Sequence, residues 1–177
     1  MSSLLHEKGY RSVGINQVLK KSGATSGSLY YHFPGGKQEL AAAAIDFFTD
    51  EFMSNLHSLS RELDSAIDVL RRVIDAFIDD MESSQYQRGG AVTNATIELT
   101  RQVPLLQKAV SNYYTRIHDF TKELLIKNGW TKRGAEIVSY TIIATIEGAL
   151  ILCKAHRSTE PLHLIAEKSE QFFSERF

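Results

Sequence analysis

The chain has 177 residues, a formal net charge of −1 and a hydrophobic content of 43%, a composition typical of a folded globular protein and not of a disordered one. Its single cysteine, Cys153, excludes a disulfide framework, and residues 1–8 lack the pattern of a signal peptide, so we expect a cytoplasmic protein. The charge is uneven, because residues 1–45 carry a net +3 and the remainder −4. Attraction for phosphate groups is therefore concentrated at one end.

The sequence predicts an all-α fold, because it has three prolines, no hairpin dipeptides and no sustained period-two alternation. The predicted helices, nine in number, cover residues 1–8, 15–22, 26–33, 37–57, 65–81, 91–100, 104–127, 132–155 and 161–176. Pro104 and Pro161 stand where proline favours a helix start. The longest apolar run, 135–153, contains Glu136 and Glu147, and its uncharged part is shorter than the ~20 residues that a bilayer needs. It indicates a core helix, and no membrane partner is expected.

The segment 23–40, GATSGSLYYHFPGGKQEL, has the pattern of a DNA-reading helix and the start of the helix after it. At 100° per residue, Leu29 and Phe33 fall on one face, and small residues and tyrosines fall on the other. An outer face of this kind can lie close to a DNA groove, where hydroxyl groups contact phosphates or base edges. Upstream, residues 15–22 have a helical apolar spacing, and Gly23 stands where a left-handed helix end is expected. The sequence therefore predicts a helix, a tight turn and a second helix in this part of the chain.

The chain resembles the DNA-binding domain of the TetR family of bacterial transcription regulators in the order and spacing of several short motifs. These are GY at 9–10, GA at 23–24, LYYHF at 29–33, and Lys37 with Leu40. The PGGK variant at 34–37 resembles the LmrA/YxaF-like subgroup, as does PLHLIAEKSEQF near the end of the chain. The resemblance implies a three-helix helix-turn-helix domain over 1–45 and a helical effector-binding and dimerisation domain over 46–177. The family also has a further turn or two of helix before the position of Met1. Either the gene starts here or upstream residues are missing from this chain, and in both cases we expect the chain as given to bind DNA less tightly than the family norm.

The resemblance implies a set of DNA-binding residues, namely Asn16, Thr25, Ser26, Gly27, Ser28, Tyr30, Tyr31, His32 and Lys37. Among them we expect Ser28 and Tyr31 to contact bases, and Tyr30 and His32 to contact phosphates. Lys37 begins a helix, where its charge and free backbone amides can share one phosphate. The alternatives are an exposed turn residue for Asn16, which could otherwise pair with adenine, and a solvated side chain for Lys37.

A regulator of this kind must respond to a signal, and the resemblance implies a small-molecule pocket within the helices after residue 45. Aromatic residues are dense there, which suits a small hydrophobic or aromatic effector. The residues predicted to bind the effector are Phe52, Phe77, Met81, Asn94, Tyr113, Ile117 and Glu147. For each of them ordinary core packing is the alternative, and Glu147 could equally hold a ligand hydroxyl, pair with an arginine or face solvent.

The last two predicted helices carry stripes of small or apolar residues that could form a homodimer interface as a four-helix bundle, which is also the family's dimer. The predicted interface residues are Thr141, Thr145, Gly148, Leu152, Leu162, Ile165 and Phe172. The alternative is that both stripes close the core of a single chain. A twofold dimer would present two reading helices to a palindromic operator.

Enzymatic interpretations have little support in the sequence. The histidines form no HxxxH or HxH pair, no cysteine cluster accompanies them, and the Gly35-Gly36-Lys37 run lacks the strand and spacing of a phosphate-binding loop. We therefore expect no catalytic residues, no metal and no cofactor. The leading hypothesis is a ligand-responsive transcriptional repressor of double-stranded DNA operators. The alternative is a helical protein that binds small molecules or partners and has lost operator recognition.

Overall fold

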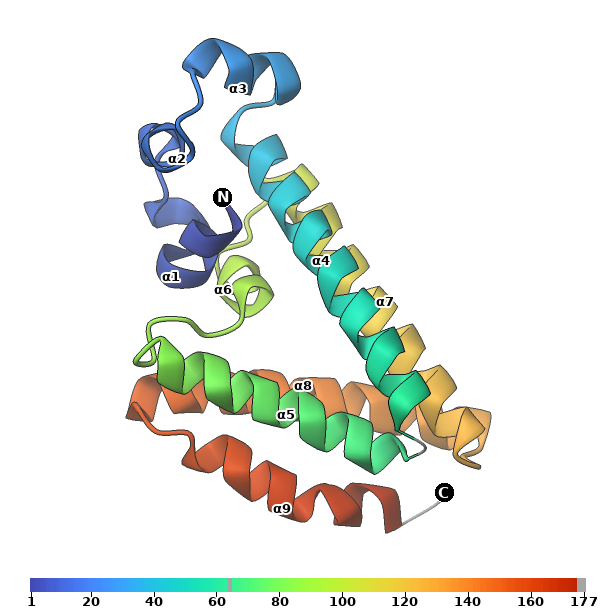
Figure 1. Ribbon diagram of the computed structural model, residues 1–177. Coiled ribbons are helices and arrows are strands. Elements are labelled where there is room, and N and C mark those ends of the chain that lie inside the picture. Colours follow the sequence, from blue (N-terminus) through green and yellow to red (C-terminus); the bar gives the residue numbers. More distant parts are fainter. Residues whose placement is uncertain (64, 175–177) are drawn as a thin grey trace. The chain divides into compact units, whose positions relative to one another are not determined.

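The computed structural model describes residues 1–63 and 65–174, of which Ala91 and residues 170–174 are described by their main chain only. All secondary structure in this described part is α-helical, as the sequence predicts (Figure 1). The helices are α1 (Ser2–Ser12), α2 (Ile15–Ser22), α3 (Ser26–His32), α4 (Lys37–Glu62), α5 (Ala66–Ser83), α6 (Ala91–Ile97), α7 (Pro104–Lys127), α8 (Lys132–His156) and α9 (Glu160–Ser174).

Helix boundaries differ from the prediction mainly in the first and fourth helices. Helix α1 runs on to Ser12, with a non-helical residue at Gly9 (φ 71°, ψ 172°) that bends it. Helix α4 continues to Glu62, whose carboxylate accepts a hydrogen bond from Ser58 Oγ (3.3 Å) within its last turn. Helix α6 ends three residues earlier than predicted, at Ile97. The end of the predicted helix 161–176 lies outside the described residues.

The chain divides into two compact units. The first contains Met1–Glu51 and Gly90–Tyr114, and the second contains Phe52–Gly89 and the residues from Thr115 onward. The helices α1, α2, α3 and α6 thus belong to the first unit, and α5, α8 and α9 to the second, whereas α4 and α7 contribute residues to both.

The core of the first unit forms around the α1–α2 pair. Leu4, Val13 and Val18 are buried together, with Met1 and Leu40 packed against them. Helix α6 packs against α1 (Figure 1), and the Asn94 side-chain amide donates a hydrogen bond to the backbone carbonyl of His6 (3.0 Å). Helix α1 is therefore held by a helix that lies far away in the sequence.

The second unit has its core where α5, α8 and α9 pack side by side (Figure 1). Its buried residues include Ile74, Met81, Leu150, Cys153 and Leu162. Helix α8 contains an apolar window with a mean hydropathy of 1.6, so by length and composition alone it could cross a membrane. Because one face of α8 is buried in this core, its apolar character has a structural explanation, as the sequence indicates for residues 135–153.

Candidate nucleic-acid interface

The turn between α2 and α3 is held by backbone conformation and short-range hydrogen bonds. Gly23 ends α2 in the left-handed region (φ 70°, ψ 7°), which glycine adopts without the steric cost that a side chain imposes. Ser22 Oγ donates to the carbonyl of Val18 (2.8 Å) and accepts from the amide of Ala24 (3.3 Å). Thr25 caps α3, since its side-chain oxygen accepts a hydrogen bond from the amide of Ser28 (3.2 Å). The predicted helix-turn-helix is thus present.

Helix α3 buries one side chain and exposes its outer face. Leu29 is 6% exposed, whereas Tyr30 is 50% and Tyr31 83% exposed. The Tyr31 ring meets the His32 ring edge-on, with 5.0 Å between ring centroids. The other exposed residues of the predicted DNA-binding set are Asn16, Thr25, Ser26, Gly27, Ser28 and His32. The structure therefore presents the predicted reading face to solvent and uses the opposite face for packing.

The first turn of α4 is anchored by its own side chains. The Glu39 carboxylate accepts a hydrogen bond from the amide of Gly35 (2.7 Å). The Gln38 side chain donates to the carbonyl of Gln102 (2.9 Å) and accepts from the amide of Leu105 (3.1 Å), at the start of α7. Lys37 therefore begins a helix whose N-terminal turn is fixed against two other segments of the first unit.

Lys37 has intramolecular partners as well as a position suited to DNA. Its ammonium group lies 3.2 Å from the backbone carbonyl of Arg11 and 4.5 Å from the centroid of the Tyr10 ring, a cation–π distance. Burial lowers the pKa of Lys37, and the nearby Glu98 carboxylate partly opposes that shift. Burial also raises the pKa of Tyr10. An ammonium group has three N–H donors, so a donor remains for a phosphate oxygen.

The residues predicted to bind an effector are divided between the two units. Phe52 and Phe77 lie in the second unit with their ring centroids 6.2 Å apart. Met81, at 1% exposure, is part of the same unit's core, and Ile117 and Glu147 are half-buried there. In the first unit Asn94 binds the α1 backbone, and the buried Tyr113 packs with its ring centroid 6.0 Å from that of Phe48.

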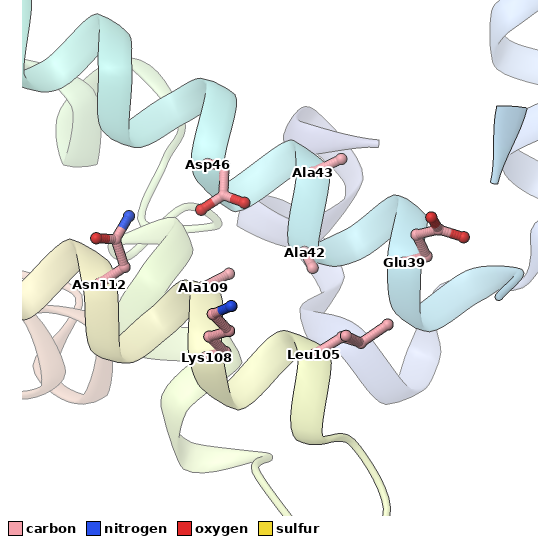
Figure 2. A pocket seen from close by; sticks show the side chains of 8 residues that line it. All are labelled: Glu39, Ala42, Ala43, Asp46, Leu105, Lys108, Ala109 and Asn112. Carbon is pink, nitrogen blue, oxygen red and sulfur yellow. The ribbon is translucent and has the colours of Figure 1, made fainter.

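Residues outside the predicted set line a groove in the first unit, between α4 and α7 (Figure 2). Its volume is about 510 Å³. Figure 2 shows Asp46 on α4 and Lys108 on α7 extending toward each other from the two helices. The lining residues are Glu39, Ala42, Ala43, Asp46, Leu105, Lys108, Ala109 and Asn112. Several are alanines or single charged residues, which helical periodicity does not distinguish from ordinary surface.

The predicted interface residues have different environments. Thr141 and Leu152 are exposed, and Gly148 is half-buried. Thr145, also half-buried, donates its hydroxyl to the carbonyl of Thr141 (2.7 Å). On α9, Leu162 is fully buried in the core and Ile165 packs against that core, which agrees at these two residues with the alternative that the α9 stripe closes the core of a single chain. The reason is that α5 and α8 both pack against α9 and cover its apolar side. The side chain of Phe172 lies outside the described residues.

Exposed apolar residues nevertheless lie on one side of α8 near both of its ends, with small residues between them, and we call this side the α8 face. Ile137 is 46%, Tyr140 59%, Ile151 47% and Leu152 49% exposed. At 100° per residue these side chains fall on one side of the helix, together with the predicted Thr141 and Gly148. Ile137, Tyr140 and Ile151 are not among the predicted interface residues. The seven-residue spacing from Ile137 to Ala144 to Ile151 was the signal available for finding them.

A net charge of +3 over residues 1–45, a helix-turn-helix in that segment with the outer face of α3 exposed, and a helical second unit are together typical of a helix-turn-helix transcription regulator. The profile of bacterial regulatory proteins of the tetR family matches residues 2–44, and that of the C-terminal domain of LmrA/YxaF-like transcriptional regulators matches residues 66–168. The chain therefore belongs to the TetR family, in its LmrA/YxaF-like subgroup.

Individual relatives agree with this assignment. The chain is 30% identical over 171 residues to the uncharacterized HTH-type transcriptional regulator YxaF of Bacillus subtilis (strain 168), covering 94% of this chain and 87% of the relative. It is 26% identical over 159 residues to the HTH-type transcriptional regulator LmrA of the same organism, covering 90% and 85%. A TetR transcriptional regulator from Legionella pneumophila has the same fold, with a TM-score of 0.84 and 21% identity over 96% of this chain and 91% of that structure.

Proposed function

We propose that this protein is a transcriptional repressor that binds a palindromic operator as a homodimer and is released by a small hydrophobic effector. The observation that carries the proposal is the outer face of α3, where Tyr31 is 83% exposed while Leu29 anchors the helix from the other side. Exposure of a large aromatic side chain to water is unfavourable. Beside Gly27 and Ser28, this side chain can instead contact thymine methyl groups and base edges in a major groove. The DNA-binding part is residues 1–45.

The α8 face supports the dimeric state in this proposal. An exposed apolar stripe on a long helix is costly in water, and a twofold axis lets the same stripe cover itself. We assign Tyr140, Thr141, Gly148, Ile151 and Leu152 to this interface, with Leu164 of α9, 50% exposed, at its margin. Two reading helices would then meet half-sites about 34–36 Å apart, or a multiple of that spacing.

For the effector we keep the predicted residues of the second unit that are not wholly buried. Phe52, Phe77 and Ile117 supply apolar contact surface, and Glu147 supplies a hydrogen-bonding group. An effector of this kind releases DNA only if it binds the DNA-incompetent conformation more tightly than the competent one. Residues 46–177 are accordingly proposed to combine effector binding with dimerisation.

The test is fluorescence anisotropy with duplexes tiled across the promoter of the protein's own gene, over a salt series, against scrambled duplexes. We expect one palindromic site to bind at least tenfold more tightly than its scrambled version. Tyr31→Ala should remove most of that preference, because one good base contact accounts for about 1–3 kcal/mol. Phe47→Ala is the matched control, since Phe47 is a 62% exposed aromatic residue outside the helix-turn-helix. Absence of any preferred duplex at low salt would favour the helical binding protein that has lost operator recognition.

A further inference from the structure

Glu98, just after the end of α6, contacts the bent C-terminal part of α1. Its carboxylate accepts a hydrogen bond from the backbone amide of Arg11 at 2.6 Å, across 87 residues of sequence. The same carboxylate occupies the space where a side chain at position 9 would begin, and Gly9 has a φ of +71°. Glycine at this position therefore permits both the bend in α1 and the approach of Glu98.

The backbone amide and the backbone carbonyl of Arg11 bind side chains of opposite charge. Its amide donates to the Glu98 carboxylate, and its carbonyl accepts from the Lys37 ammonium group at 3.2 Å. A single residue thus separates a fixed negative charge from the lysine that begins α4. The proximity also has an electrostatic consequence, because Glu98 acts to raise the pKa of Lys37 against the lowering caused by burial.

We propose that Glu98 sets the strength of the Lys37 contact with DNA: its hydrogen bond positions Arg11 and so Lys37, while its negative charge weakens the hold of Lys37 on phosphate. This inference rests on the proposed DNA-binding function. Glu98 is a positioning residue that restrains affinity, since a phosphate approaching Lys37 also approaches the carboxylate. The two effects are separable, because glutamine keeps an oxygen acceptor for the Arg11 amide and removes the charge.

The expected size of the effect follows from the charges. A unit charge within roughly 10 Å of a phosphate, near a protein surface at low salt, changes affinity by about threefold, and two half-sites bring this to about tenfold for a dimer. The Debye length shortens from about 10 Å at 0.1 M salt to about 3 Å at 1 M, so the effect should fade as salt is raised. Tighter binding on loss of the charge that strengthens the Glu98–Arg11 hydrogen bond is the reverse of what a purely structural role of Glu98 predicts.

The experiment measures operator affinity of Glu98→Gln by fluorescence anisotropy between 0.05 and 0.5 M salt. The matched control is Glu51→Gln, which removes the same charge from an exposed residue of α4, about 21 Å along the helix from Lys37. We expect Glu98→Gln to bind about tenfold more tightly than the wild type at the lowest salt and about equally at the highest. Glu51→Gln should bind like the wild type throughout.

Two further variants test whether Glu98 acts through Lys37. In a Lys37→Ala background, Glu98→Gln should gain much less affinity than in the wild-type background, and a full gain there would overturn the inference. Glu98→Ala, which also loses the hydrogen bond, should bind less tightly than Glu98→Gln. Equal or weaker binding by Glu98→Gln, with an unchanged melting temperature, would equally overturn it. Failure of the wild-type protein to prefer any duplex would instead refute the proposed function.

Discussion

Substitution of Ile151 by glutamate should separate the proposed dimer into folded monomers. Ile151 is 47% exposed in the single chain, which leaves roughly 85 Å² of apolar surface available for burial by a second copy and is equivalent to about 2 kcal/mol at 25 cal/mol per Å². A twofold interface contains the residue twice, so the loss is about 4 kcal/mol, or about a thousandfold in the dimer dissociation constant. The unpaired carboxylate adds a further cost when it is buried.

The assay is sedimentation velocity over a concentration series from nanomolar to 100 micromolar, with circular dichroism to show that the helices remain. Ile97→Glu is the matched control, because Ile97 is a 67% exposed isoleucine on α6, outside the α8 face. We expect wild type and Ile97→Glu to remain dimers at concentrations where Ile151→Glu is monomeric. The reasoning is refuted if Ile151→Glu dimerises as tightly as the wild type, or if both variants dissociate alike.

Three further outcomes follow from burial and backbone geometry. Gly23→Ala should lower the free energy of unfolding by about 1 kcal/mol or more, measured by urea denaturation, because Gly23 has a φ of 70°. Leu162→Ala, at 0% exposure, should cost about 2–5 kcal/mol in the same assay, whereas Leu105→Ala, at 45% exposure and outside the proposed interface, should cost far less; equal losses would contradict the core position of Leu162. Cys153 is buried and burial raises the pKa of its thiol, so a thiol reagent should label it only in the unfolded protein, and rapid native labelling would show that it is accessible.

The helices and the reading face of α3 were largely predictable from the sequence. Their signals are local: the spacing of Leu29 and Phe33, the glycine at position 23 and the proline at position 104 each act within one or two turns of their own helix. Local backbone preferences and apolar periodicity decide which residues form a helix and which side of it is buried. The exposed Tyr31 and buried Leu29 confirm that separation of faces.

Only the tertiary structure decided which neighbour covers each apolar face and which distant polar groups meet. Periodicity marked the Leu162 stripe and the α8 stripe alike, but the first packs into the core of its own chain and the second remains exposed. Likewise nothing local relates Glu98 to Arg11, which are 87 residues apart. Burial and charge pairing depend on which segments fold against each other, and this is a property of the whole chain that no window of sequence contains.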